Sequence, residues 1–380
     1  MKFDYNFKNY DFWLVIYMLA LNIMGVMIIR SAVNAADFRD TQVVRQIIGS
    51  FVGFVICIVL SLIDYRKIVK QANVIYFFSV LLLIGVKIYG TASGHGAVRW
   101  IQLPVLGKVQ PAEFAKIGLI VFYASFFHKN KQHINSPHVV LTAFVFYLIP
   151  ILLILLQPNL STAIIITVIV AAIVFASNIS YRWILGVVLA ILPFALIFIY
   201  LFKSGLYDHI PFLQGYQADR ILTFLNPSDN TQTFYQQLYS IMAIGSGQFA
   251  GKGLNNDSIF SIKNGNFLAE EDNDFIFAVI GEELGFRGSI IIVIIFLLII
   301  IECLIIASKA KKMSGRLICV GMMAWIGFQT YTNIAVATGI FPNTGITLPF
   351  FSRGVSSLLS VYIGMGLVLN VALQRKDSAI

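Results

Sequence analysis

Hydrophobic positions along the chain fall into long runs rather than an alternating pattern. Apolar stretches of roughly twenty residues recur from one end of the sequence to the other. That length suits an α-helix crossing a hydrocarbon core of about 30 Å, where backbone groups must pair within their own segment. We therefore expect ten transmembrane helices, at residues 11–30, 46–63, 73–90, 111–127, 139–156, 162–178, 183–202, 275–307, 317–339 and 355–373.

The composition supports the same fold class. The 380 residues are 58% hydrophobic and 12% charged, with a mean hydropathy of +0.83. The core of a water-soluble protein of this length does not require so apolar a composition. We predict an all-α integral membrane protein that forms one polytopic domain over residues 1–380. No small-residue cleavage site follows the first run, which is expected to be a permanent span. Cys57, Cys303 and Cys319 lie inside apolar runs and are expected to be buried hydrophobes.

Basic residues account for the net charge of +9 and predict the orientation. They gather at both chain ends and in alternate loops, near 66–70, 129–131, 182 and 309–316. Short loops rich in Lys and Arg stay in the cytoplasm. We therefore expect both termini to be cytoplasmic, and we attribute the positive charge to topology rather than to a nucleic-acid partner.

One connection on the expected outer side is much longer than the rest. Residues 203–274 are too many for a bare linker, and loops of that size usually carry function. We interpret this segment as an extracytoplasmic cap that contains interfacial helices. The apolar pattern that follows, from Asp274 to Ala307, would be roughly 50 Å long as a helix and exceeds the bilayer. We expect its first part, DFIFAVIGEELGF, either to stand partly above the hydrocarbon or to bend near Gly285 and Gly288, so that Glu282, Glu283 and Arg287 avoid lipid.

Polar and charged residues concentrate on this outer side, which predicts an extracytoplasmic site because charges at membrane depth are costly. Glu113 and Lys116 share a helix face and can pair. They are interpreted either as a structural ion pair or as the lining of a polar cavity where Lys116 meets an anionic substrate. Arg99 and Trp100 are residue types that anchor a protein at the membrane interface. Alternatively, the guanidinium of Arg99 binds the phosphate oxygens of a substrate.

The glycine-rich run 245–253 resembles a phosphate cradle only superficially. Gly253 follows Lys252 where a Walker A loop needs Ser or Thr, and no strand precedes the run, so we expect no nucleotide. Tight helix packing or a turn explains the glycines equally well. Lys252 is kept as a candidate for binding an anion.

Asp274 ends an acidic cluster and begins a long apolar helix. One interpretation is an N-terminal helix cap, which needs only one carboxylate. The cluster also includes Glu270, Glu271 and Asp272, and crowding of like charges favours proton uptake by at least one member. The alternatives are therefore a general base at Asp274, or a divalent cation, magnesium or manganese, bound there.

Six motifs in order give the chain a specific resemblance. They are GAVRWIQL, VQPAEFAK, QPNLSTA, SIMAIGSGQFAGKG, NDFIFAVIGEELGF and NIAVATGIFPNTGITLPFFSRGVSS. With them the chain resembles the SEDS family of shape, elongation, division and sporulation proteins, typified by RodA, FtsW and SpoVE. The resemblance implies ten helices in a bacterial cytoplasmic membrane and polymerisation of lipid II, an undecaprenyl-pyrophosphate-linked disaccharide peptide, into glycan strands. It also implies a class B penicillin-binding protein as partner.

The resemblance also implies roles for individual residues. The family's essential acidic residue falls on Asp274, and its conserved Arg, Glu and Lys fall on Arg99, Glu113 and Lys116. Substrate-binding candidates within or beside the motifs are Trp100, Lys252, Asn333, Thr344, Ser352, Ser356 and Ser357. The chain departs from the usual family residues at Asp272, Asn159, Arg353 and Val355, which bears on substrate selection and catalytic strength.

These residues lead to an inverting glycosyl transfer as the first hypothesis. Asp274 would deprotonate the acceptor hydroxyl, and Arg99, Lys116 and Lys252 would stabilise the departing pyrophosphate. Two alternatives come from other classes: a flippase or transporter of lipid-linked precursors, and a catalytically weak scaffold for the penicillin-binding protein. The residues leave open whether the chain serves elongation, division or sporulation.

Overall fold

The computed structural model describes residues 5–33, 38, 40–92, 98–103, 107–206, 215–225, 231–256, 261–263 and 272–375. This part of the chain is predominantly helical, with three short strands. A 3-10 helix, η1 (Phe7–Asn9), precedes helices α1 (Phe12–Ala32), α2 (Thr41–Leu62), α3 (Tyr65–Lys70), α4 (Ala72–Tyr89), α5 (Pro111–Lys129), α6 (Pro137–Leu155), α7 (Leu160–Ala176), α8 (Tyr181–Lys203), α9 (Gly215–Leu225), α10 (Thr231–Ser246), α11 (Ile276–Lys309), α12 (Met313–Ala337) and α13 (Val355–Leu373).

Each of the ten ranges expected to span the membrane is occupied by a helix. Seven of these helices, α1, α2, α4, α6, α8, α11 and α13, are long and apolar enough to cross a bilayer, and α7 is apolar but shorter. The remaining two, α5 and α12, are lined mostly by buried residues, so they face other helices and need not be apolar on every side. The chain is a multi-pass membrane protein, and the count of ten crossings stays a prediction.

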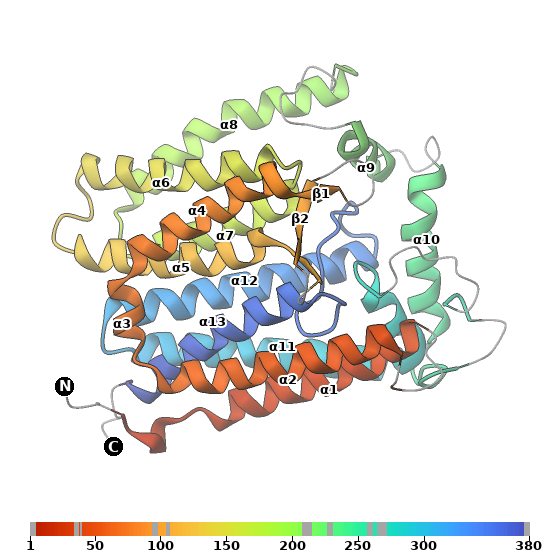
Figure 1. The fold of residues 1–380 in the computed structure, drawn as a ribbon. Coiled ribbons are helices and arrows are strands. Elements are labelled where there is room, and N and C mark those ends of the chain that lie inside the picture. The colour runs from red at the N-terminus through yellow and green to blue at the C-terminus, as the bar shows by residue number, and fades with distance from the viewer. Residues whose placement is uncertain are drawn as a thin grey trace.

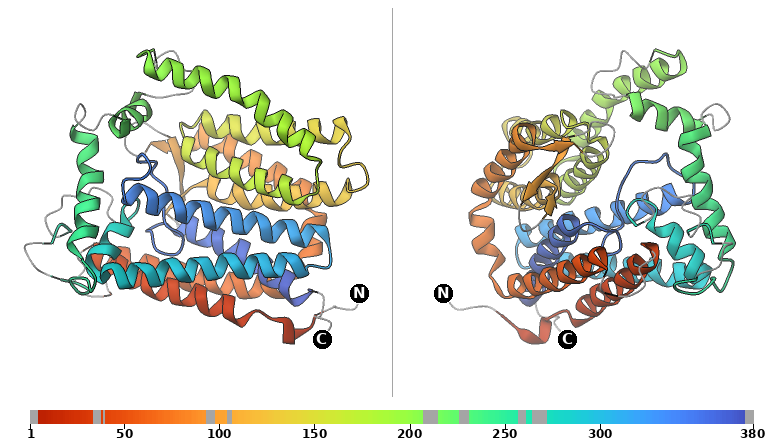
Figure 2. Two further views of the ribbon diagram at one scale, coloured as in Figure 1. Left: turned by 180° about the vertical axis from the view of Figure 1, so that it is seen from behind. Right: turned by 45° about the vertical axis from the view of Figure 1, so that its right-hand side comes forward.

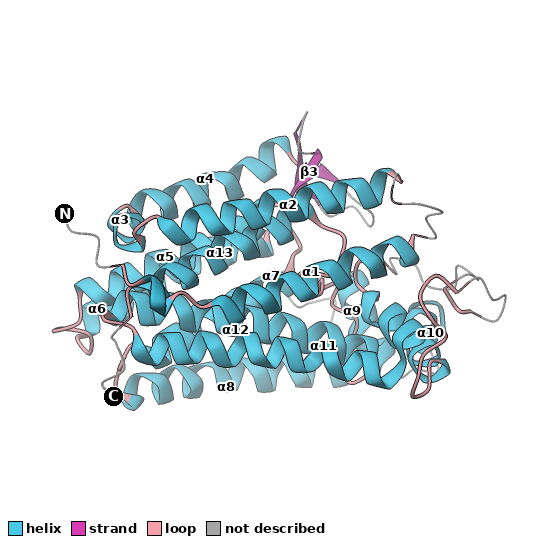
Figure 3. Ribbon diagram, turned by 90° about the horizontal axis from the view of Figure 1, so that it is seen from below, coloured by secondary structure: helices cyan, strands magenta, loops and turns pink. Residues whose placement is uncertain are grey.

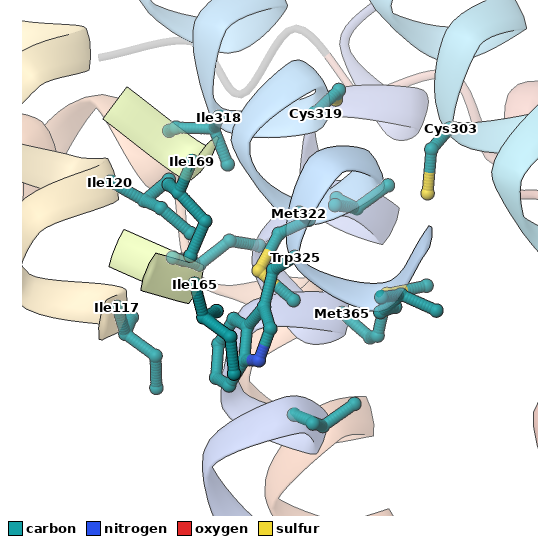
Figure 4. Packing of buried hydrophobic residues seen from close by; sticks show 14 of the residues in the cluster. Ile117, Ile120, Ile165, Ile169, Cys303, Ile318, Cys319, Met322, Trp325 and Met365 are labelled. Carbon is teal, nitrogen blue, oxygen red and sulfur yellow. The ribbon is translucent and has the colours of Figure 1, made fainter. Parts of the chain in front are cut away.

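The helices run side by side, with α12 and α13 near the centre (Figure 1). α13 packs on α2, α11 packs on α12, and α4 packs on α5, so segments far apart in sequence share one core. Buried side chains from α5, α7, α11, α12 and α13, among them Trp325, belong to one hydrophobic cluster (Figure 4). The three cysteines are free and buried, as expected.

The two ends of this helical array differ in character. Both termini, α3, the α5–α6 connection and the α11–α12 connection lie at one end, which we call the termini end (Figures 1 and 2). The other end, the α10 end, carries α9 and α10. Most of the loops expected to be cytoplasmic by their basic residues therefore gather at the termini end, and the α10 end holds the outward-assigned segments.

Strands β1 (Thr91–Ala92), β2 (Val98–Leu103) and β3 (Gly107–Val109) make a small antiparallel sheet in the order β1-β2-β3. The sheet lies at the α10 ends of α4 and α5 (Figures 1 and 3). Its register pairs Ile101 with Val109 and Gln102 with Lys108. The sheet fixes the backbone of β2, on which Arg99 stands.

Helix α11 contains the expected bend. It is 34 residues long, and Gly285 adopts φ +66° and ψ −166°, far from helical values. Only glycine adopts such angles without strain. The break separates a nine-residue outer part, Ile276–Leu284, from the apolar membrane part that follows. Helix α8 contrasts with it, because none of its apolar span is buried by protein, leaving that surface for lipid (Figure 2).

The predicted orientation is testable by labelling from either side of the membrane. The native thiols are fully buried, so a membrane-impermeant maleimide should react only with introduced cysteines. We expect Tyr235→Cys on α10 to be labelled in intact cells, and Lys131→Cys in the α5–α6 connection only after the membrane is opened. Labelling of both variants in intact cells, or the opposite pattern, would contradict the orientation.

Candidate functional site

Asp274 lies two residues before α11 begins, and its backbone is held from α12. The first residue flanking the helix is Phe275, and no side chain caps this end, so Asp274 is not an N-terminal cap. Asn333 Nδ2 donates hydrogen bonds to the carbonyl oxygens of Asp274, at 2.9 Å, and Ile346, at 2.7 Å. One amide on α12 therefore joins Asp274 to the loop 343–353.

The residues before Asp274 are fastened to the same loop. Ser352 Oγ donates to the carbonyl of Asn273 at 2.6 Å, and the backbone N–H of Arg353 donates to the carbonyl of Asp272 at 2.9 Å. The guanidinium of Arg353 lies 2.6 Å from Asp272 Oδ2. The Asp272 carboxylate is therefore engaged by its own cation. Glu270 and Glu271, the other expected members of the acidic cluster, lie outside the described residues.

The Asp274 side chain lies against Gly345, where an arginine joins it. A Cβ added to Gly345 would stand 3.3 Å from Asp274 Oδ2 and 3.6 Å from Arg220 Nη1. Arg220 comes from α9, stands over the ring of Tyr216 at 5.8 Å and donates to the carbonyl of Asn343 at 3.4 Å. The carboxylate and this guanidinium therefore line one space above Gly345.

Arg99 brings a second guanidinium to the same place. Its Nη2 donates to the Tyr216 hydroxyl at 2.6 Å and to the carbonyl of Pro158, and Tyr216 itself donates to Pro158 O at 2.9 Å. Burial lowers the pKa of Arg99, and the nearby Arg220 lowers it further, whereas Tyr216 and Asp274 act in the opposite direction. Arg99, Arg220 and Asp274 thus lie within electrostatic range of one another.

Uncharged polar groups with unused hydrogen-bonding capacity surround these charges. Gln157 Oε1, Asn159 Nδ2, Thr223 Oγ1 and Thr344 Oγ1 are buried and have no hydrogen-bond partner among the residues that the structure describes. Asn159 meanwhile caps α7 through its Oδ1, which accepts from Thr162 N at 3.3 Å. Buried polar atoms without partners are costly, so such a group usually serves water or a ligand.

Glu113 and Lys116 pair deep in the protein. The two side chains are 2.8 Å apart, and that of Lys116 has no exposed surface. Lys116 also stands 4.4 Å from the Trp325 ring and donates to Gln329 Oε1 at 3.3 Å, while Ser360 donates to Glu113. This geometry favours the structural ion pair over the cavity lining. The pair still reaches the site indirectly, because Gln329 Nε2 donates to Thr347 O at 2.9 Å.

The other candidates divide between the site and its surroundings. Asn333, Ser352 and Thr344 belong to the site, and Ser161 Oγ donates to the Thr344 carbonyl. Lys252 pairs with Glu282 at 2.6 Å, which gives it a carboxylate partner in place of a free anion site. Ser356 Oγ accepts from Gln110 N at 3.2 Å. Trp100, on β2, pairs with Thr91, and Ser357 stands in the first turn of α13.

Only some of the residues at this site could be predicted from the sequence. Arg220 and Tyr216 were missed because they lie in the long connection 203–274, where the one available signal was a charged, amphipathic stretch, GYQADRILTFL. Gln329 was missed because, beyond the Trp325 indole four residues before it, its partners are Lys116, 213 residues before it, and Thr347, 18 residues after it.

Comparison with known proteins places the chain in a family. The family described as "Cell cycle protein", which groups FtsW, RodA and SpoVE, matches residues 12–377. The chain belongs to this family. It is 33% identical to a probable peptidoglycan glycosyltransferase FtsW of Trichlorobacter lovleyi, over 98% of this chain and 95% of the relative. It is 31% identical to the peptidoglycan glycosyltransferase MrdB of Escherichia coli, with 96% and 93% covered.

Solved structures show the same fold. A chain from a study of polymerization and crosslinking by a peptidoglycan synthase complex superposes with a TM-score of 0.78 and 27% identity, covering 96% of this chain and 97% of that one. The Thermus thermophilus rod shape determining protein RodA gives a TM-score of 0.69 and 26% identity, with 97% and 98% covered. The expected family and the all-α membrane fold are confirmed.

The buried ion pair yields a stability prediction. Lys116→Met leaves the Glu113 carboxylate buried without its cation, which should reduce the free energy of unfolding by about 3–5 kcal/mol. Thermal unfolding in detergent measures the loss. The double variant Glu113→Gln with Lys116→Met removes both charges and should recover much of it. Equal destabilisation in the single and double variants would show that the pair is not what stabilises this region.

Proposed function

We propose that this chain polymerises peptidoglycan glycan strands from lipid II, with Asp274 as the general base. The observation that carries the proposal is the Asp274 carboxylate lying against Gly345 in reach of two guanidinium groups, in a chain whose relatives are named peptidoglycan glycosyltransferases. Asp274 takes the proton of the acceptor sugar hydroxyl. The resulting oxygen attacks the anomeric carbon of the lipid-linked donor, the bond from that carbon to pyrophosphate breaks, and the configuration inverts.

Two arginines supply the charge that the leaving group needs. Pyrophosphate gains negative charge as the bond breaks, and guanidinium groups bind phosphate oxygens two at a time. Arg99 and Arg220 are held in place by the carbonyls of Pro158 and Asn343, so they need little rearrangement during the reaction. General-base assistance contributes about 10²- to 10⁴-fold, which leaves positioning and charge neutralisation to provide the rest.

A magnesium or manganese ion is compatible with the oxygen atoms near Asp274. Asn333 Oδ1 and Thr344 Oγ1 are buried and have no hydrogen-bond partner in the described part of the chain. Together with the Asp274 carboxylate they are the hard oxygen donors that such ions prefer. Among the described residues, no three His, Cys, Asp or Glu side chains form a metal-binding group. A bound ion would add positive charge beside the pyrophosphate, and the residue roles given above do not depend on it.

The lipid substrate and the partner follow from the same proposal. The site lies at the α10 end, which we assign to the extracytoplasmic face of a bacterial cytoplasmic membrane, with both termini in the cytoplasm. Lipid II and its undecaprenyl chain would reach it from the surrounding lipid. The likeness to a chain of a peptidoglycan synthase complex supports a class B penicillin-binding protein as the partner that cross-links the product.

A flippase and a scaffold remain the competing functions. Transporters place ionisable groups near the midplane, often in broken helices. Here α11 breaks only nine residues after its outer start, and the two arginines stand outside the spans. A scaffold would not require a carboxylate positioned between cations.

Removing the base tests this proposal against both competitors. With purified protein, its penicillin-binding partner and labelled lipid II, Asp274→Ala should lower polymer formation by about 10²-fold or more. Transbilayer movement of lipid II without polymer would indicate the flippase. Wild-type protein that neither forms polymer with its cognate partner nor moves lipid II across the bilayer would leave only the scaffold.

The leaving-group arginine gives an independent test. Arg220→Gln should lower kcat by about 10²- to 10³-fold, because one fixed donor to the developing charge is lost. Arg287→Gln is the matched control, since it removes an exposed guanidinium on α11 outside the site. Equal rates for the two variants would remove Arg220 from the mechanism.

A further inference from the structure

The glycine-rich run 245–253 enters the break in α11. In an unbroken helix, Phe286 N and Arg287 N would donate to the carbonyls of Glu282 and Glu283. Here the run supplies replacements: Phe286 N donates to Gln248 O at 2.8 Å, Arg287 N to Phe249 O at 3.2 Å, Lys252 N to Glu282 O at 2.9 Å and Gly253 N to Glu283 O at 2.9 Å. These two N–H groups and two carbonyl groups are therefore paired again across the break. We call this contact the splice.

The splice depends on glycines because backbone meets backbone. A Cβ at Gly247 would collide with the carbonyl oxygen of Gly281, and one at Gly251 would collide with that of Glu283. Gly251 also adopts φ +80°. Gly245, two residues before Gly247, has no atom within 4 Å of its Cβ position. The run therefore contains a glycine that the contact requires and a neighbouring one that it does not.

Two buried carboxylates lock the splice through side chains. Glu282 accepts from Lys252 Nζ at 2.6 Å, from Ile262 N at 2.9 Å and from Lys263 N at 3.3 Å. Glu283 accepts from Lys263 Nζ at 2.9 Å, and Ser31 on α1 hydrogen-bonds to both. The side chains of Glu282, Glu283 and Lys263 are at most 2% exposed. These residues fasten the external segment and α1 to the turn of α11 just before its break.

The part of α11 before the break begins two residues after Asp274, so a change in its direction at Gly285 would move Asp274. The nine residues of this part, Ile276–Leu284, extend about 13 Å beyond the break. A tilt of about 10° at the break would move its far end by about 2 Å, and a misplacement of about 1 Å can cost 100-fold in rate. Asn333 and Ser352 hold the backbone at Asp274 and Asn273. The splice holds the other end of this part of α11, next to the break.

We propose that the splice is a positioning device for Asp274, with Gly247, Gly251, Glu282 and Lys252 as positioning residues that touch no substrate. This inference rests on the proposed role of Asp274 as base. It assigns the glycine-rich run a role in catalysis without any anion binding. It also separates Lys252 from the residues that meet pyrophosphate.

The test compares two alanine variants two residues apart. Gly247→Ala should expose the amides of Phe286 and Arg287 to hydrogen exchange and lower kcat for polymerisation by about 10- to 100-fold, with KM for lipid II changed less than twofold. Gly245→Ala should keep both the protection and the rate. A Gly247→Ala protein that loses the protection and keeps its kcat would overturn the proposal, as would a change confined to KM.

A side-chain variant keeps the test decisive if Gly247→Ala fails to fold. Lys252→Met removes the cation from Glu282 and should lower kcat by about tenfold, whereas Lys252→Arg keeps the pair and should restore the rate. A rise in KM shared by Lys252→Met and Lys252→Arg would show instead that Lys252 binds substrate. Failure of the proposed function is distinguishable, because it appears as full activity in Asp274→Ala whatever these variants do.

Discussion

The rest of the structure depends on one constraint, which is that a backbone or charged group near lipid must find its partner within the protein. Helix α11 breaks at Gly285, and four of the backbone groups beside the break are paired by the run 248–253. The break lets the outer part of α11 take its own direction. Asp274 can then lie among polar segments while the rest of the helix remains apolar. Without the splice, the break would be too costly to keep.

Charge pairing divides the ionisable groups into two kinds. Lys116, Lys252 and Lys263 each have a carboxylate partner, at 2.8, 2.6 and 2.9 Å, and so they stabilise the scaffold. Arg99 and Arg220 are held mainly by carbonyl and hydroxyl oxygens, which orient a guanidinium but do not neutralise it. Positive charge therefore remains available beside Asp274, where a lipid-borne pyrophosphate would need it.

Much of this could be predicted from sequence, because the membrane imposes long apolar runs that local composition reveals. The ten helical ranges, the bend at Gly285 and the grouping of Arg99 with Asp274 follow from such patterns or from the family resemblance. Arg220 and Tyr216 could not be placed, since α9 reaches the site only through the tertiary fold. Lys252 was kept as a candidate for binding an anion because of the glycine-rich run around it. Its ion pair could not be predicted, since Glu282 is 30 residues away and no periodicity links the two residues.

As proposed above, the Asp274 carboxylate meets a lipid-borne sugar at the α10 end of the protein. The most direct measurement uses sealed proteoliposomes of known protein orientation, with labelled lipid II confined to one leaflet. We expect polymer only from the leaflet at the α10 end, and none from that leaflet with Asp274→Asn. Polymer made from the leaflet at the termini end, or undiminished polymer from Asp274→Asn, would contradict it.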